Sequence, residues 1–76
     1  METNEISEIL KQNGFAETNQ KGIYEKYIDE KKSIKAYVNG KGVILHRVEK
    51  GEKQKKMNVQ ADTPEDFKES LNSIEK

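Results

Sequence analysis

The chain has 76 residues, 14 basic and 14 acidic side chains, a net charge of zero and no cysteine. This length predicts a single small domain over residues 1–76, with no room for a separate catalytic domain. Without cysteine the chain has no disulfides, thiolate nucleophiles or cysteine-based metal sites, and no apolar run has the length of a signal peptide or membrane span. We therefore expect a soluble, cytoplasmic protein with no membrane partner.

The zero net charge hides an uneven distribution along the sequence. Residues 1–20 hold one lysine against four glutamates, and residues 61–76 hold two lysines against five acids, so each end carries −3. Residues 21–60 hold eleven Lys and Arg against five acids and carry +6. If the ends are helices and the middle is a sheet, the helices are acidic and the sheet is basic.

The first predicted element is a helix over residues 4–13. Thr3 or Asn4 is placed to cap its start, and Gly14 is placed to end it in the left-handed conformation that glycine adopts freely. Phe15 follows at the position from which a side chain folds back onto the last turn. One face of this helix is apolar, with Ile6, Ile9 and Leu10 at the i, i+3, i+4 spacing.

The stretch from Ala16 to Gly22 is rich in turn formers and predicts a loop that could include a short edge strand. The residues after it have the composition of a strand, but two phases of alternation are open. An odd number of loop residues before the next strand turns Tyr24 and Ile28 inward, whereas an even number turns Ile23 and Tyr27 inward. Either phase leaves one tyrosine and one isoleucine for the other face.

Residues 34–48 predict a β-hairpin, because Asn39-Gly40 separates two alternating runs and both residues tolerate the positive φ of a tight turn. A two-residue loop pairs Ala36 with Val43, and a four-residue loop pairs Val38 with Val43. Both registers give the same faces. The predicted core face carries Ile34, Ala36, Val38, Val43 and Leu45, and the other face carries Lys35, Tyr37, Ile44, His46 and Val48.

A charged turn around Gly51 leads into a further predicted strand over residues 55–61, followed by a helix. Thr63 is placed to cap this helix, with Pro64 at its first position and Asp66 at its third. The inward residues of the strand are Met57, Val59 and Ala61, its outward residues are Lys56, Asn58 and Gln60, and the apolar stripe of the helix is Phe67, Leu71 and Ile74.

The order of these elements predicts a two-layer α+β fold. It comprises an N-terminal helix, a three- or four-stranded antiparallel meander sheet and a C-terminal helix, α-β-β-β(-β)-α. Both helices are expected on the face that carries Ile34, Leu45 and Val59.

Residues 5–22, EISEILKQNGFAETNQKG, resemble the opening of the HicA-type toxin ribonucleases, small domains with an α-β-β-β-α fold like that of double-stranded-RNA-binding domains. In that family the Lys-Gly pair is followed by serine and then by the catalytic histidine. Here Lys21-Gly22 is followed by Ile23 and Tyr24. The resemblance therefore implies the order of elements but not the ribonuclease activity.

His46 is the only histidine of the sequence. Catalysis by a lone histidine needs an orienting carboxylate and a nucleophile or metal nearby, and no motif supplies that set. Glu25 and Glu49 are the carboxylates that could approach it across strands. We therefore predict a non-enzymatic protein with no catalytic residue, no metal site and no cofactor.

The predicted partner-binding residues are Lys35, Tyr37, Ile44, His46, Val48 and Lys56. A face meant only for water would not place Ile44 and Val48 beside Tyr37. We predict a protein-binding module, an inhibitor or adaptor of the kind that phages and mobile elements encode, whose partner is another protein or a second copy in a homodimer. The alternative is a single-stranded nucleic-acid-binding protein in which tyrosines stack on bases and lysines, with Arg47, contact phosphates.

Overall fold

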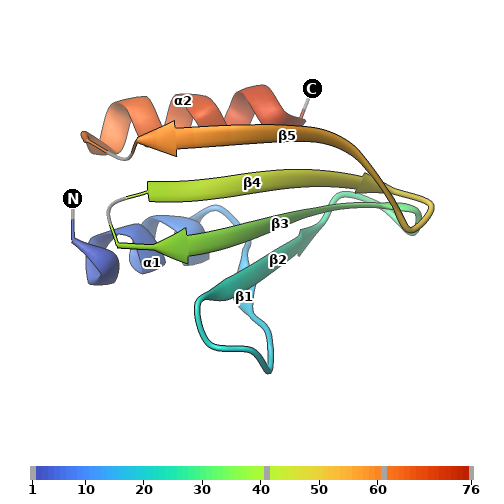
Figure 1. Cartoon of the computed structure of the whole chain (residues 1–76), viewed down its shortest axis with the longest axis horizontal. Helices are drawn as coiled ribbons and strands as arrows, with labels where there is room; N and C mark the ends of the chain where they lie inside the picture. Colours follow the sequence, from blue (N-terminus) through green and yellow to red (C-terminus); the bar gives the residue numbers. More distant parts are fainter. Residues whose placement is uncertain (1, 41, 61, 76) are drawn as a thin grey trace.

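The computed structural model describes residues 2–40, 42–60 and 62–75 and confirms the predicted α+β fold (Figure 1). Five strands form one antiparallel sheet in the chain order β1-β2-β3-β4-β5. The sheet has one strand more than the longer prediction, because the tract after the first helix contributes a short edge strand. The elements are α1 (Thr3–Gln12), β1 (Ala16–Glu17), β2 (Ile23–Tyr27), β3 (Lys32–Asn39), β4 (Gly42–Glu49), β5 (Glu52–Gln60) and α2 (Pro64–Glu75).

Both helices pack on one face of the sheet, as predicted. Helix α2 contacts β4 and β5, and α1 contacts β3 (Figure 1). The core between the layers consists of Ile6, Ile9, Leu10, Phe15, Tyr24, Ile34, Ala36, Val43, Leu45, Val59, Phe67, Leu71 and Ile74. Within the described residues, neither helix is long and apolar enough to cross a membrane.

Helix α1 ends as its sequence predicts. Gly14 has a φ of +92°, its N–H donates to the Lys11 carbonyl, and the Phe15 N–H donates to the Leu10 carbonyl at 2.9 Å. This pair of bonds satisfies two end carbonyls of the helix and turns the Phe15 side chain into the core. The start differs from the prediction, because Glu2 and not Thr3 or Asn4 is the capping residue.

Helix α2 starts and packs as predicted. The Thr63 hydroxyl accepts a hydrogen bond from the Asp66 N–H at 3.2 Å, which satisfies one free donor of the first turn. Phe67, Leu71 and Ile74 are all buried, so the stripe read from the sequence is the face that meets the sheet. Near the other end, the Arg47 guanidinium donates to the Ile74 carbonyl at 3.4 Å and ties β4 to the last turn of α2.

The inward and outward side chains of β2 alternate as expected for an odd number of loop residues before β3. Tyr27 pairs with Ser33, so five residues lie between the paired positions, and Tyr24 turns inward with 6% of its surface exposed. The Tyr24 hydroxyl lies 2.6 Å from the Ser7 hydroxyl of α1. Ile28 does not turn inward as that alternative proposed. It lies outside the strand in the β2–β3 turn and is 38% exposed.

The central hairpin adopts the register that pairs Val38 with Val43. Pairing continues to Asn39 and Gly42, and Gly40 takes the positive φ of +63° that the Asn-Gly signal predicts. Lys41 lies outside the described residues. The predicted core face is confirmed: Ile34, Ala36, Val43 and Leu45 are buried, and Val38 packs against them.

Strand β5 begins at Glu52, three residues before the predicted start. The β4–β5 turn contains only Lys50 and Gly51, and a bulge opposite the Arg47–Val48 step leaves Gln54 without a partner. Beyond the bulge, Val59 is buried and Met57 packs against the core, which confirms the predicted inward phase. Ala61, the third predicted inward residue, lies outside the described residues.

Candidate interaction face of the sheet

The sheet face opposite the helices, called the outer face below, is organised in three rows that cross the strands. Each row consists of residues paired in register on neighbouring strands. The apolar row is Ile23, Tyr37, Ile44 and Asn58; the charged row is Glu25, Lys35, His46 and Lys56; and the turn row is Tyr27, Ser33, Val48 and Lys53.

All six residues predicted to bind a partner lie on this outer face. Alternation along the hairpin is responsible, because it places every second side chain of β3 and β4 away from the helices. Lys35, Tyr37, Ile44, His46 and Val48 are half-buried and Lys56 is exposed. Ile23 and Tyr27 join them, which decides between the two phases left open by the sequence.

The apolar row forms a strip across three strands. Ile23 of β2 pairs with Tyr37 of β3, which pairs with Ile44 of β4. All three side chains are half-buried by their neighbours within the sheet. Because α1 and α2 both pack on the other face, no described helix covers this strip.

His46 lies at the centre of the outer face. Its ring packs against the Tyr37 ring, with centroids 4.9 Å apart and planes tilted by 56°. Partial burial lowers the pKa of His46 below 6.5, and the positive charges of Lys53, Lys56 and Lys35 lower it further. The imidazole is therefore neutral at pH 7 and surrounded by cations.

The two carboxylates that could have oriented His46 are not beside it. Glu49 lies on the helix side of β4, where its carboxylate pairs with the Arg47 guanidinium at 3.2 Å. Glu25 is in the same row as His46, but Lys35 stands between them. The register neighbours of His46 are thus Lys35 and Lys56, which supply no proton acceptor.

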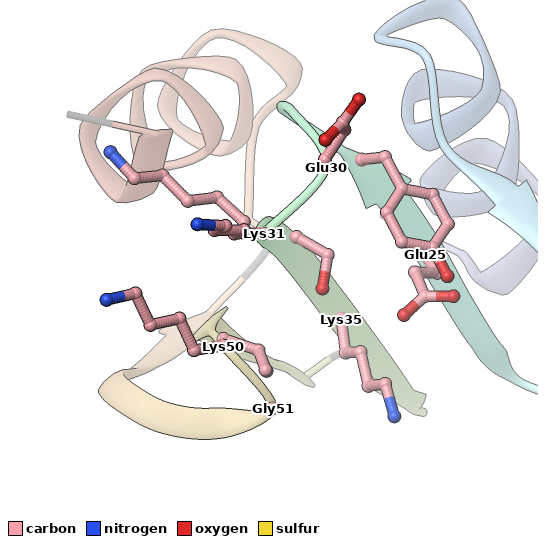
Figure 2. Close-up of a pocket in the computed structure, with 10 residues that line it drawn as sticks. Glu25, Glu30, Lys31, Lys35, Lys50 and Gly51 are labelled. Carbon is pink, nitrogen blue, oxygen red and sulfur yellow. The ribbon is translucent and has the colours of Figure 1, made fainter.

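A hollow of about 430 Å³ opens at one end of the outer face, where the β2–β3 and β4–β5 turns meet (Figure 2). We call it the turn hollow. The two turns are joined by a hydrogen bond from the Lys50 N–H to the Lys31 carbonyl at 2.7 Å. Its charged lining residues are Glu25, Glu30, Lys31, Lys32, Lys35 and Lys50.

Asp29 shapes the first of these turns. One oxygen of its carboxylate accepts the N–H groups of Lys31 at 2.8 Å and Lys32 at 2.9 Å. The hydrogen bond from Lys31 is the main cause that lowers the pKa of Asp29 below 3.8. Asp29 therefore fixes the peptide group between Lys31 and Lys32, whose carbonyl accepts the hydrogen bond from the Lys50 N–H. Nothing in the sequence around Asp29 indicates this contact with a distant turn.

Comparisons with protein-family models, curated proteins and solved structures find no match for this chain.

Proposed function

We propose that this protein is a non-enzymatic binding module whose outer sheet face docks onto an acidic surface of another protein. The observation that carries the proposal is the apolar row, in which Ile23, Tyr37 and Ile44 lie side by side on the face without a helix. The charged row lies along one side of this row, and Asn39, Gly42 and Gln60 lie along the other. An apolar strip with a polar border resembles the common anatomy of protein interfaces.

The charge of the face favours an acidic partner. The pKa of His46 is lowered by the positive charges of Lys35, Lys53 and Lys56. Glu25 is the one acid of the three rows. A partner surface with carboxylates at the rim would meet these lysines, and its apolar side chains would cover Tyr37 and Ile44. The module would act as an inhibitor or adaptor by occupying or bridging the partner's surface.

A different protein suits the face better than a second copy. In a two-fold dimer whose axis passes near His46, at the centre of the outer face, Lys35, Lys53 and Lys56 would approach the same three lysines of the other copy. Like charges brought together at an interface oppose association. The lack of cysteine suits a reducing compartment, and we place the association in the cytoplasm.

The position of the tyrosines argues against the nucleic-acid alternative. Tyr24 is buried and bonded to Ser7, and Tyr37 is half-buried against His46, so of the three tyrosines only Tyr27, at 70% exposure, presents an open ring. Single-strand binding needs several free aromatic faces. We expect labelled single-stranded DNA and RNA not to bind at physiological salt. A tight complex that weakens steeply with salt and is lost in Lys35→Glu/Lys56→Glu would instead support nucleic-acid binding.

Differential affinity capture tests the proposal. The double variant Tyr37→Glu/Ile44→Lys places charges in the apolar row, and Glu8→Lys/Lys68→Glu makes matched changes at exposed positions of the two helices. Both leave the net charge unchanged. We expect a protein that is captured by the wild type and the helix variant but not by the outer-face variant, and that binds the wild type again when purified. Equal capture by all three proteins, or unfolding of the outer-face variant, would refute the proposal.

A further inference from the structure

Lys50 has an unusual backbone conformation for its residue type. It has a φ of +54° and is the one described non-glycine residue with a positive φ. Gly51 follows at +81°, so both residues of the β4–β5 turn have the positive φ that a tight twist-matched hairpin requires. Asparagine or glycine is usual at the position of Lys50, and strain of this kind is concentrated at functional sites.

The turn hollow below Lys50 combines positive charge with polar and apolar lining. Four lysines face two glutamates around it, a net charge of +2. Figure 2 shows Lys31 and Lys50 extending on the same side of the hollow, with Glu25 and Glu30 on the opposite side. Lys35, the register neighbour of Glu25, lies on the side of the glutamates, so one side of the opening is basic and the other carries charges of both signs.

Ser33 adds a polar group to this hollow. It lines the hollow with 8% of its surface exposed, and its hydroxyl makes no hydrogen bond with another described residue. The hydroxyl oxygen is not fully enclosed, so a ligand in the hollow can reach it. Tyr27 and Val48 provide apolar wall beside it.

We infer that the turn hollow binds an acidic segment of the partner protein, with a carboxylate on the Lys31–Lys50 side and an apolar side chain against Tyr27 and Val48. This inference rests on the function proposed above and specifies which part of the outer face recognises the acidic chemistry. Lys50 supplies its ammonium group to this site from a backbone conformation in which asparagine or glycine is usual.

A peptide titration followed by NMR tests this site without knowledge of the partner. The probe is acetyl-Glu-Glu-Leu-Glu-Glu-amide, and the control replaces each glutamate by glutamine. We expect the acidic peptide to shift the amide signals of Ser33, Lys35, Lys50 and Gly51, and the glutamine peptide not to do so. Binding should weaken as NaCl rises from about 50 to about 500 mM, because salt screens exposed charges.

Three variants distinguish the effect of removing a charge from the effect of disturbing the fold. Lys50→Asn removes the ammonium while keeping a residue that tolerates positive φ, and Lys31→Gln keeps the carbonyl that accepts the Lys50 N–H. We expect each to weaken peptide binding by about threefold to tenfold with the fold intact. Lys55→Gln removes a charge from the helix side of β5, where Lys55 pairs with Arg47, and should leave binding unchanged.

The inference is overturned if the acidic peptide causes no shifts, if the shifts lie outside the turn hollow, or if Lys50→Asn and Lys31→Gln bind like the wild type. Its failure is distinguishable from failure of the proposed function. Partner capture that survives Lys50→Asn but is lost in Tyr37→Glu/Ile44→Lys would leave the outer face as the interface and exclude the turn hollow from it.

Discussion

The ring of His46 packs against the ring of Tyr37 at a centroid distance of 4.9 Å and joins the charged row of the outer face to the apolar row. Both residues are paired with neighbours on adjacent strands, Tyr37 with Ile44 and His46 with Lys35. The imidazole therefore titrates within a surface that holds three lysines nearby. Its charge state links the pH to the stability of this face.

Stability should fall as the pH falls through about 6.5. The folded pKa of His46 is lowered from 6.5, so between these two pKa values the unfolded chain binds more protons than the folded one. The stabilisation is fully present above 6.5 and is lost as the pH falls towards the folded pKa. Denaturant melts from about pH 5 to about pH 7.5 should show a smaller pH dependence for His46→Gln than for the wild type. Identical pH profiles would refute this role of His46.

The assignment of the two sheet faces predicts different effects for neighbouring residues. Leu45 is fully buried, so Leu45→Ala should lower the free energy of unfolding by ~2–5 kcal/mol through lost burial and a cavity. Ile44 is half-buried on the outer face, and Ile44→Ala should cost much less. Equilibrium denaturation of the two variants measures this difference. A larger loss for Ile44→Ala would reverse the assignment of faces.

The Tyr24–Ser7 contact predicts a measurable coupling between β2 and α1. The two hydroxyls lie 2.6 Å apart, and Tyr24 is buried. Tyr24→Phe and Ser7→Ala should each lower stability by about 0.5–1.5 kcal/mol, as expected for loss of one hydrogen bond. A double-mutant cycle should show a total loss well below the sum of the two single losses. Strict additivity would mean that this contact does not stabilise the fold.

The hairpin faces and the helix stripes were predictable because each depends on a local pattern. Alternation from Ile34 to Val48 determines the faces in either hairpin register, and Gly14 ends α1 through backbone geometry alone. The inward stripe of α2 follows in the same way from helical spacing. For these elements, local preference and burial agree.

The phase of β2 and the start of β5 were not predictable, since neither depends on a local pattern. Tyr24 and Tyr27 are equally acceptable as inward residues, and only the length of the β2–β3 turn selects Tyr24. The bulge at Gln54 lies in a run of exposed polar residues, where no alternation of apolar side chains indicates the register. The turn hollow was missed for a further reason, because Lys31 and Lys50 meet through tertiary contact between two separate turns.

The carboxylate of Asp29 should make the β2–β3 turn sensitive to acid. Asp29→Asn keeps an oxygen acceptor for the Lys31 and Lys32 N–H groups, whereas Asp29→Ala removes it and should destabilise the turn. The folded pKa of Asp29 is lowered from 3.8, so its contribution is present above that pH and is lost as the pH falls through the folded pKa. Melts between about pH 5 and about pH 2 should show less acid destabilisation in Asp29→Asn than in the wild type. Equal stability of Asp29→Ala and the wild type at neutral pH would contradict this role.

Site-specific photo-cross-linking tests the central claim, that the outer face is the partner-binding surface. Tyr27 on that face is 70% exposed, and Glu69 is exposed on α2. Each is replaced in turn by p-benzoylphenylalanine, and both proteins are irradiated in lysate of the source cells. We expect a covalent adduct with a protein from position 27 and none from position 69. An adduct from position 69 alone, or no adduct from position 27, would contradict the claim.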